Sequence, residues 1–275
     1  MAADSASTRP YRTAAAYYHA RPPYSAQLHS ALVAKLGWDG TGRLLDVGCG
    51  PGVLALELAP AFGEVIGLDP EPAMLAEAQR RHGADSIQWI EGRAEEMPGL
   101  GLGHFDAVTF GQSLQWMDRP SVIEIVFSML RPSGAMLVIN HIPPDLSRES
   151  AQEATPFIPH GLVDEVLAQY GAAKPPRPAA WERHEVVIGR SPFGGCDVLV
   201  LPGRRDLVRT PEWIVENQLS TSYAAPERFG ERLADFQDDL LRRLRHVAGP
   251  KGVFLELPGD TEVLIARKLE SADPK

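Results

Sequence analysis

The chain has 275 residues, and 44% of them are hydrophobic, enough for one substantial core or for a core domain with an appended subdomain. Its formal net charge of −9 disfavours nucleic acid and anionic membranes as partners, because binding to polyanions relies on basic residues that release counterions. The two cysteines, Cys49 and Cys196, imply no disulfide framework, and Met1–Arg12 lacks the apolar region of a secretory signal, so we expect a cytoplasmic protein.

The first half of the chain alternates short apolar runs, typical of buried strands, with segments of helical periodicity. The expected strands are Arg43–Val47, Glu64–Leu68, Ser86–Glu91, Phe105–Phe110 and Ala135–His141. The expected helices are Ser25–Leu36, Gly52–Phe62, Glu71–His82 and a segment from Asp118 or Ser121 to about Leu130. Strands separated by helices require crossover connections, which predicts a parallel sheet.

The pattern changes after the fifth strand. Ile142–Trp181 is rich in proline, with one expected helix near Leu162–Tyr170, and an insertion of this length is typical of a segment that covers a site. The remaining elements are expected as strands at Asp197–Leu201 and Val263–Lys268 and as helices at Glu212–Ser220 and Pro226–His246.

A glycine-rich loop, Gly48-Cys49-Gly50-Pro51-Gly52, follows the first strand and opens a helix. Glycine permits close approach of the backbone to a ligand, because no Cβ intervenes. The spacing is G-x-G-x-G, so the third glycine comes one residue earlier than in the dinucleotide fingerprint G-x-G-x-x-G. The loop therefore predicts a ligand at the helix start without specifying a pyrophosphate.

Two aspartates narrow the class of ligand. Asp69 ends the second strand, about 20 residues beyond the loop, where an acidic residue accepts hydrogen bonds from ribose hydroxyls. Asp46 precedes the first glycine, where its charge would repel a pyrophosphate and suits a ligand with ammonium and sulfonium groups. Together they favour a cationic adenosine derivative.

At this point the chain resembles the class I S-adenosylmethionine-dependent methyltransferases, the type 11 group in particular. The matching segments are LLDVGCGPG (Leu44–Gly52), VIGLDPEPAML (Val65–Leu75), EGRAEEMP (Glu91–Pro98), FDAVTFGQSLQWM (Phe105–Met117) and LRPSGAMLVI (Leu130–Ile139). The tail, Arg209–Ser222 with Val263–Lys268, is similar to small-molecule methyltransferases of bacterial secondary metabolism. The resemblance implies a Rossmann-like, doubly wound, seven-stranded α/β sheet, mostly parallel with one antiparallel strand near the C-terminus, plus a helical lid and insertion.

The resemblance also implies S-adenosylmethionine as cofactor and a role for single residues. Those expected at the donor are Asp46, Gly48 and Gly50 at the methionine moiety, Asp69 at the ribose, Pro70, Met74, Ala94 and Glu95 at the adenine, Gly111, Gln112 and Ser113 as a closing segment, and Tyr17 and Arg21 of the lid at the carboxylate. Two positions depart from the family pattern: Gln115 stands where relatives often have histidine, and Arg93 where aspartate is common.

Methyl transfer requires alignment of the acceptor and, for some acceptors, a general base. His141, at the end of the fifth strand, is the first candidate base, and His19 of the lid is the second. The residues expected at the substrate are Trp116, His141, Trp213 and Tyr223, with Trp89 a further aromatic candidate. Each of these side chains has a structural alternative, as a core aromatic or as a histidine bonded to the backbone.

The expected segments are a lid at residues 1–36, a donor-binding core at 37–141, a substrate cap at 142–181 and a C-terminal part at 182–275, whose helices at 210–246 lie near the substrate. The chain contains no Asn/Asp-Pro-Pro-aromatic tetrapeptide after the fourth strand and no Pro-Cys nucleophile. With the acidic charge, this favours a small-molecule acceptor, no nucleic acid or membrane partner, no metal, and a monomer or homodimer. Two alternatives stay open: an NAD-dependent oxidoreductase and a non-catalytic S-adenosylmethionine-binding protein.

Overall fold

The computed structural model describes residues 11–144, 155–176, 181–204, 207–257 and 259–269. These residues form two compact units. The sheet unit comprises Tyr24–Ile142, Ala179–Pro202 and Asp260–Lys275. The helical unit comprises Met1–Pro23, Pro143–Pro178 and Gly203–Gly259. These divisions of the chain differ from the four expected segments, since residues 24–36 belong with the sheet and residues 203–259 with the other unit.

The sheet unit holds seven strands in the order β3-β2-β1-β4-β5-β9-β6. Their bounds are β1 Arg43–Val47, β2 Glu64–Asp69, β3 Ile87–Glu91, β4 Phe105–Gly111, β5 Leu130–His141, β6 Asp197–Leu201 and β9 Thr261–Arg267. Strand β9 runs antiparallel to both of its neighbours, and the pairs from β3 to β5 are parallel. The expected doubly wound sheet, with one antiparallel strand near the C-terminus, is confirmed.

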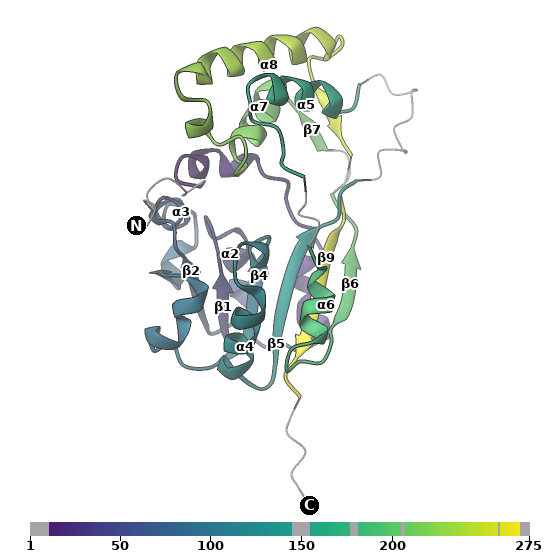
Figure 1. Ribbon diagram of the computed structural model, residues 1–275. Helices are drawn as coiled ribbons and strands as arrows, with labels where there is room; N and C mark the ends of the chain where they lie inside the picture. Colours follow the sequence, from purple (N-terminus) through teal and green to yellow (C-terminus); the bar gives the residue numbers. More distant parts are fainter. Residues whose placement is uncertain (1–10, 145–154, 177–180, 205–206, 258, 270–275) are drawn as a thin grey trace, which may run out of the picture. The chain divides into compact units, whose positions relative to one another are not determined.

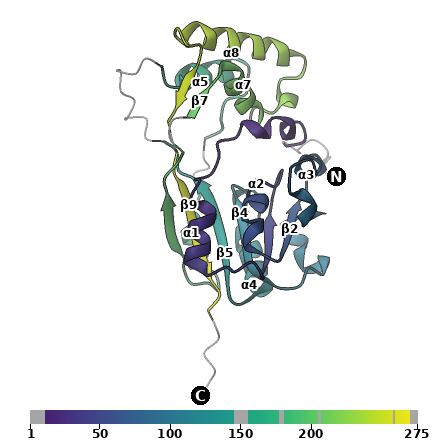
Figure 2. The same ribbon diagram turned by 180° about the vertical axis from the view of Figure 1, so that it is seen from behind.

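Helices cover both faces of this sheet. On one face lie α1 (Leu28–Leu36) and α2 (Val53–Leu58), and on the other α4 (Arg119–Met129) and α6 (His184–Gly189), each with its own apolar cluster. Figure 1 shows α4 and α6 in front of the sheet, and Figure 2, from behind, shows α1 in front of it. A further helix, α3 (Pro72–Gln79), follows β2. Central strands such as β4 are buried on both faces, which explains why their sequences are mostly apolar.

The helical unit is built around α8 (Leu233–Val247). Its residues Phe236, Leu240 and Leu244 recur every four positions and are fully buried in one cluster with α5 (His160–Gln169) and α7 (Pro211–Leu219). A two-stranded antiparallel sheet, β7 (Leu207–Arg209) with β8 (Phe254–Glu256), and an N-terminal 3-10 helix, Ala14–Ala20, complete this unit.

Several predicted elements have different bounds in the structure, and in two of them the local backbone shows the difference clearly. The segment Pro226–His246, expected as one helix, divides into two 3-10 turns followed by α8, because Gly230 takes a left-handed conformation (φ 56°) that a continuous helix does not permit. Strand β5 begins at Leu130, five residues before the expected Ala135, and pairs there with Phe105 across an irregularity in the register. Helix α6 and the β7–β8 pair were not expected from the sequence.

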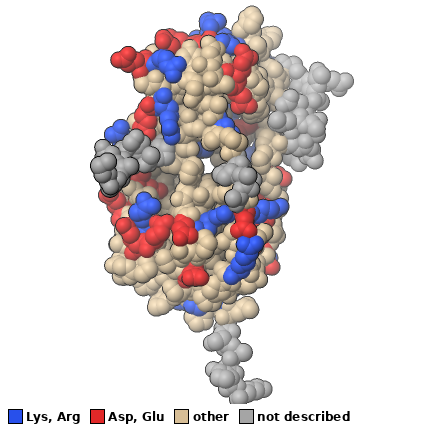
Figure 3. Space-filling view, in the orientation of Figure 1, with Lys and Arg blue, Asp and Glu red and all other residues tan. Residues whose placement is uncertain are grey.

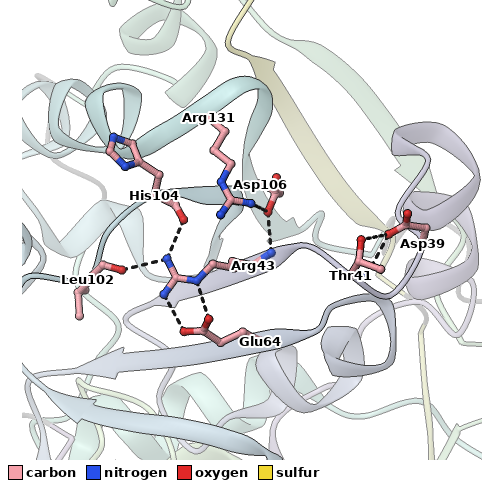
Figure 4. A network of polar contacts seen from close by, with 8 residues as sticks. All are labelled: Asp39, Thr41, Arg43, Glu64, Leu102, His104, Asp106 and Arg131. Carbon is pink, nitrogen blue, oxygen red and sulfur yellow. Dashed lines mark hydrogen bonds and ion pairs between the residues drawn. The ribbon is translucent and has the colours of Figure 1, made fainter.

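The amino ends of β1 and β2 are joined through Arg43 (Figure 4). Its guanidinium donates two hydrogen bonds to Glu64, at 2.6 and 2.7 Å, and one each to the carbonyl oxygens of Leu102 and His104, at 3.0 and 2.8 Å. Its backbone N–H donates to Asp106 at 2.7 Å. Ligands bind to such sheets at the carboxyl ends of the parallel strands. The Arg43 network lies at the opposite, amino ends. Among the described residues, no helix combines the length and apolar composition needed to cross a membrane.

Candidate active site

The glycine loop leaves β1 with three residues in the left-handed region: Gly48, Gly50 and Gly52 have φ of 65°, 54° and 74°. A Cβ on Gly48 would lie 2.6 Å from the Cβ of Ser113, so only glycine fits at that position. The Gly48 N–H donates to the Leu68 carbonyl at 2.7 Å, which ties the loop to β2. These contacts fix the shape of the loop.

The third glycine meets a protein side chain. A Cβ on Gly52 would lie 2.4 Å from the indole of Trp89, and a Cβ on Gly67 would lie 2.5 Å from the same indole. The Trp89 Nε1–H donates to the Ala84 carbonyl at 3.1 Å. Trp89 thus packs beneath the loop and supports it, which favours the core alternative over a place in a substrate wall.

Asp69, at the end of β2, is buried and holds both the loop and the next helix. One carboxylate oxygen accepts from the Gly50 N–H and the other from the Glu71 N–H, each at 2.8 Å. Burial raises the pKa of Asp69, and the two backbone amides oppose that shift. Each oxygen of a carboxylate has two acceptor sites, so one on each oxygen stays available for a ribose hydroxyl.

Asp46 is 1% exposed beside the loop. Its Oδ1 accepts from the Thr109 hydroxyl at 2.8 Å, whereas its Oδ2 is buried and has no hydrogen-bond partner among the described residues. Burial raises the pKa of this carboxyl to about 7, against the effects of Thr109 and the Ala55 amide, and the charge of Asp69 raises it further. An unpaired buried carboxylate is costly, and a cationic ligand would remove that cost.

The segment after β4 is also strained into a fixed shape. Gln112 has φ of 55°, a left-handed conformation rare for a residue with a side chain, and its carbonyl accepts from Gln115 Nε2 at 2.6 Å. Ser113 donates from its hydroxyl to the Val47 carbonyl at 2.6 Å, which joins this segment to β1. Gln115, at the position where relatives often have histidine, therefore braces the turn after Gly111.

The residues expected at the adenine follow β2 and β3. Pro70 is exposed, whereas Met74 and Ala94 are almost fully buried. Glu95 accepts from the Asp118 N–H at 3.3 Å and pairs with Arg93 Nε at 3.6 Å. Arg93, which stands where aspartate is common in the family, thus pairs with the neighbouring carboxylate of Glu95.

His141 is the last residue of β5. It therefore lies at the carboxyl ends of the parallel strands, where the donor loop also lies. Its imidazole stacks on the ring of Tyr24, with centroids 4.7 Å apart and an interplanar angle of 14°. Trp116, in the short 3-10 helix after β4, is 57% exposed and so presents its indole to solvent. Both side chains are accessible in part, as substrate-contacting residues must be.

The remaining predicted residues belong to the helical unit and pack on α7. His19 places Nε2 3.1 Å from Glu216 Oε2 and Nδ1 3.2 Å from the Ala16 carbonyl oxygen. Arg21 donates from Nη2 to the Ser220 carbonyl at 2.7 Å, and its Nε is buried with no partner among the described residues. Tyr17 packs against the apolar cluster of this unit.

Two aromatic residues of the helical unit, Trp213 and Tyr223, have a polar or charged neighbour. The Arg209 guanidinium lies over the Trp213 ring, 3.9 Å from its centroid, so one indole face is already covered. Burial raises the pKa of Tyr223, while the Thr221 hydroxyl and the charge of Arg21 oppose the shift. The structure therefore groups Tyr223 with Arg21 within one unit.

Comparison with known proteins supports the interpretation of the glycine loop as part of a methyltransferase domain. Residues 44–134 match the model of a methyltransferase domain family. An uncharacterized methyltransferase of Mycobacterium tuberculosis is 29% identical over 157 residues, which cover 56% of this chain and 78% of that protein. The malonyl-[acyl-carrier protein] O-methyltransferase of Enterobacter lignolyticus is 35% identical over 45% of this chain and 51% of its own length. The nocamycin O-methyltransferase of Saccharothrix syringae is 34% identical over 55% of this chain and 53% of its own.

The fold comparison points the same way. A candidate type II methyltransferase from Anaeromyxobacter dehalogenans superposes with a TM-score of 0.54 at 20% identity, covering 91% of this chain and 99% of that one. The sheet order and the glycine loop agree with the class I S-adenosylmethionine-dependent methyltransferases, and the methyltransferase domain matched at residues 44–134 supports that class. S-adenosylmethionine is its cofactor, and the unpaired Asp46 oxygen and the free acceptor sites of Asp69 fit such a ligand.

Proposed function

We propose that the chain transfers a methyl group from S-adenosylmethionine to a small molecule, with oxygen as the favoured acceptor atom and nitrogen or carbon as further possibilities. The observation that carries this proposal is His141, a stacked imidazole at the carboxyl end of β5, on the edge of the sheet that holds the donor loop. When bound, the cofactor supplies a methyl carbon that its sulfonium group has already activated.

The protein's residues have three tasks in this proposal. Asp46 and Asp69 bind the donor through its positive charge and its ribose. The braced segment Gly111-Gln112-Ser113 closes over it. His141 accepts the proton of the acceptor's hydroxyl, carboxylic acid or amine group. Alignment of this kind contributes about 7–11 kcal/mol to lowering a barrier, more than the base alone.

We choose His141 rather than His19 as the base because of the contacts that His19 makes. Both ring nitrogens of His19 face oxygen atoms of its own unit, Glu216 Oε2 and the Ala16 carbonyl. Neither nitrogen of His19 thus has a lone pair directed toward an acceptor in this arrangement. We assign His19 a role in holding the N-terminal segment on α7.

Three observations support a small acceptor rather than a macromolecule. The net charge is −9, and Figure 3 shows acidic and basic side chains interspersed over the face it displays. The motifs used for bases of nucleic acids are missing from the sequence. The Saccharothrix relative is, by its name, a nocamycin O-methyltransferase. We also propose a cytoplasmic setting, a place in bacterial secondary metabolism, and a monomer or homodimer.

The proposal is tested by screening the purified chain against a metabolite library, with S-adenosylhomocysteine release as readout. The expected result is release with one class of small hydroxyl, carboxyl or amine compounds, strongly reduced in His141→Gln. The conservative control is His104→Gln, whose side chain lies at the opposite end of the strands. Tight donor binding with no release across the library would favour the non-catalytic alternative. Unchanged turnover of His141→Gln would remove the base assignment.

A further inference from the structure

The stacked partner of His141 has no role in the donor contacts described above. Tyr24 lies just before α1, far from β5 in sequence, yet its ring is nearly parallel to the imidazole at 4.7 Å. Such a stack covers one face of the imidazole. It therefore restricts rotation of the His141 ring and holds its nitrogens beside the end of β5.

The backbone that carries Tyr24 is anchored to the same part of the sheet. The next residue, Ser25, donates its N–H to the Thr261 hydroxyl at 2.8 Å, and both residues are almost fully buried. Thr261 is the register partner of His141 in the β5–β9 pair. The stack is thus fixed by a hydrogen bond to the strand beside His141.

The hydroxyl end of Tyr24 lies at the donor side. A Cβ on Gly111 would stand 2.9 Å from the Tyr24 hydroxyl oxygen, so the missing side chain at Gly111 makes room for the phenol. Gly111 ends β4 and begins the braced segment expected to close over the donor. Tyr24 therefore connects the ends of β4 and β5.

We propose that Tyr24 is a positioning residue for His141: its ring fixes the plane of the imidazole and stabilises the imidazolium that forms when His141 takes the acceptor's proton. A cation over the face of a tyrosine ring is attracted to it. This inference rests on the proposed function, because that function makes His141 the base. The ring, rather than the hydroxyl, carries the effect.

Other titratable groups lie on the elements packed around His141. They are Asp260 and Glu262 at β9, Asp106 on β4, Glu57 on α2, and His29 and Lys35 on α1. All of them stay in place when only Tyr24 is changed, so a difference between Tyr24 variants reports on the stack.

The test is an NMR titration of the protein labelled at histidine, with the His141 signal assigned from its loss in His141→Gln. We expect Tyr24→Leu to lower the titration midpoint of His141 by about half a pH unit, the size of one cation–π contact, and Tyr24→Phe to leave it within about 0.2. If Tyr24→Leu fails to fold, Tyr24→Met fills the same space without a ring. Equal shifts in the Phe and Leu variants, or no shift in either, would overturn the proposal.

Turnover gives a second readout with the acceptor found in the screen. Tyr24→Leu is expected to lower kcat about tenfold, because alignment of the base is lost. Tyr24→Phe is expected to keep the kcat of the parent protein. A Phe variant as slow as the Leu variant would assign the effect to the hydroxyl and contradict the proposal. The titration itself needs no acceptor. Failure of the Tyr24 role therefore shows as an unmoved midpoint, whereas failure of the proposed methyl transfer shows as absent turnover.

Discussion

At the scale of single residues, the donor site is defined by two carboxylates that differ in how many of their oxygens accept hydrogen bonds. Both oxygens of Asp69 accept backbone N–H groups, and its remaining acceptor sites suit ribose hydroxyls. Asp46 has one oxygen hydrogen-bonded to Thr109 and one without a partner among the described residues. The first residue organises the loop before the ligand arrives, and the second provides a place for positive charge.

The state of Asp46 predicts a pH dependence of donor binding. Burial raises its pKa from 3.8 to about 7, so the stability that this carboxyl contributes is complete below pH 4 and is lost as the pH rises through 7, where the folded carboxyl ionises. A cationic ligand favours the ionised form. The affinity for S-adenosylmethionine should therefore rise on the order of tenfold between pH 6 and pH 7.5, as the ionised fraction grows. Calorimetric titration at four pH values measures this rise.

The matched variant for this prediction is Asp46→Asn, which keeps the shape of the side chain and cannot ionise. It should bind the donor more weakly at pH 7.5 and with little dependence on pH. It should also resist unfolding better than the parent at pH 8, where the parent carries an uncompensated buried charge. An Asn variant with the same pH dependence as the parent would show that Asp46 is not the titrating group.

Replacing Asp69 is expected to weaken binding of the donor and its product. Replacement by Ala removes a charge-assisted contact to the ribose, which should weaken binding of S-adenosylhomocysteine by about 1–3 kcal/mol. Asp197→Ala is the control, because that carboxylate is exposed on β6 and pairs only at the surface, with Lys35. Affinity unchanged by the Asp69 substitution would refute its ribose role.

At the scale of elements, the loop after β1 depends on what lies beneath it. Gly52→Ala brings a Cβ to 2.4 Å from Trp89 and forces a side chain into the left-handed region, so we expect a loss of about 2–4 kcal/mol in the free energy of unfolding. Gly101→Ala is the control, since Gly101 has φ of 65° but open space around it, and should cost only about 1 kcal/mol. Urea unfolding measures both, and equal losses would show that Trp89 plays no part.

The Arg43 network is expected to contribute to the free energy of unfolding and not to donor binding. Arg43→Ala leaves Glu64 and two loop carbonyls without their donor, which should lower the free energy of unfolding by about 2–3 kcal/mol. Donor affinity should stay unchanged, because the network lies at the amino ends of the strands. Arg190→Ala, which removes an exposed pair with Glu182, should change stability by less than about 1 kcal/mol. A weakened donor affinity in Arg43→Ala would contradict this division of the sheet.

At the scale of the whole molecule, the sequence was most informative where neighbouring residues decide the structure. Strands β1, β2 and β4 were predicted to within a residue or so because buried strands have mostly apolar sequences between turn signals. The partly exposed strands β3 and β6 were predicted equally well from their short apolar runs. The β7–β8 pair was missed because each strand has three residues and its partner is distant in the chain. Helix α6, with six residues, is too short to show a helical period.

The candidate site divides in the same way. Asp46 and Asp69 were predicted from their places at strand ends, next to the glycines. The stack of Tyr24 on His141 and the contact of Gly52 with Trp89 depend on which strands lie side by side, and local sequence carries no signal for either. The expected donor contacts of Tyr17 and Arg21 stay predictions, since both residues belong to the helical unit.

The central claim is that the loop and its two carboxylates bind a cationic adenosine derivative. It is tested most directly by calorimetric titration of the purified chain with S-adenosylmethionine and with NAD in one buffer at pH 7.5. The account predicts saturable binding of S-adenosylmethionine at one site per chain, weakened in Asp69→Ala, and no saturable binding of NAD. Saturable binding of NAD without binding of S-adenosylmethionine would contradict it.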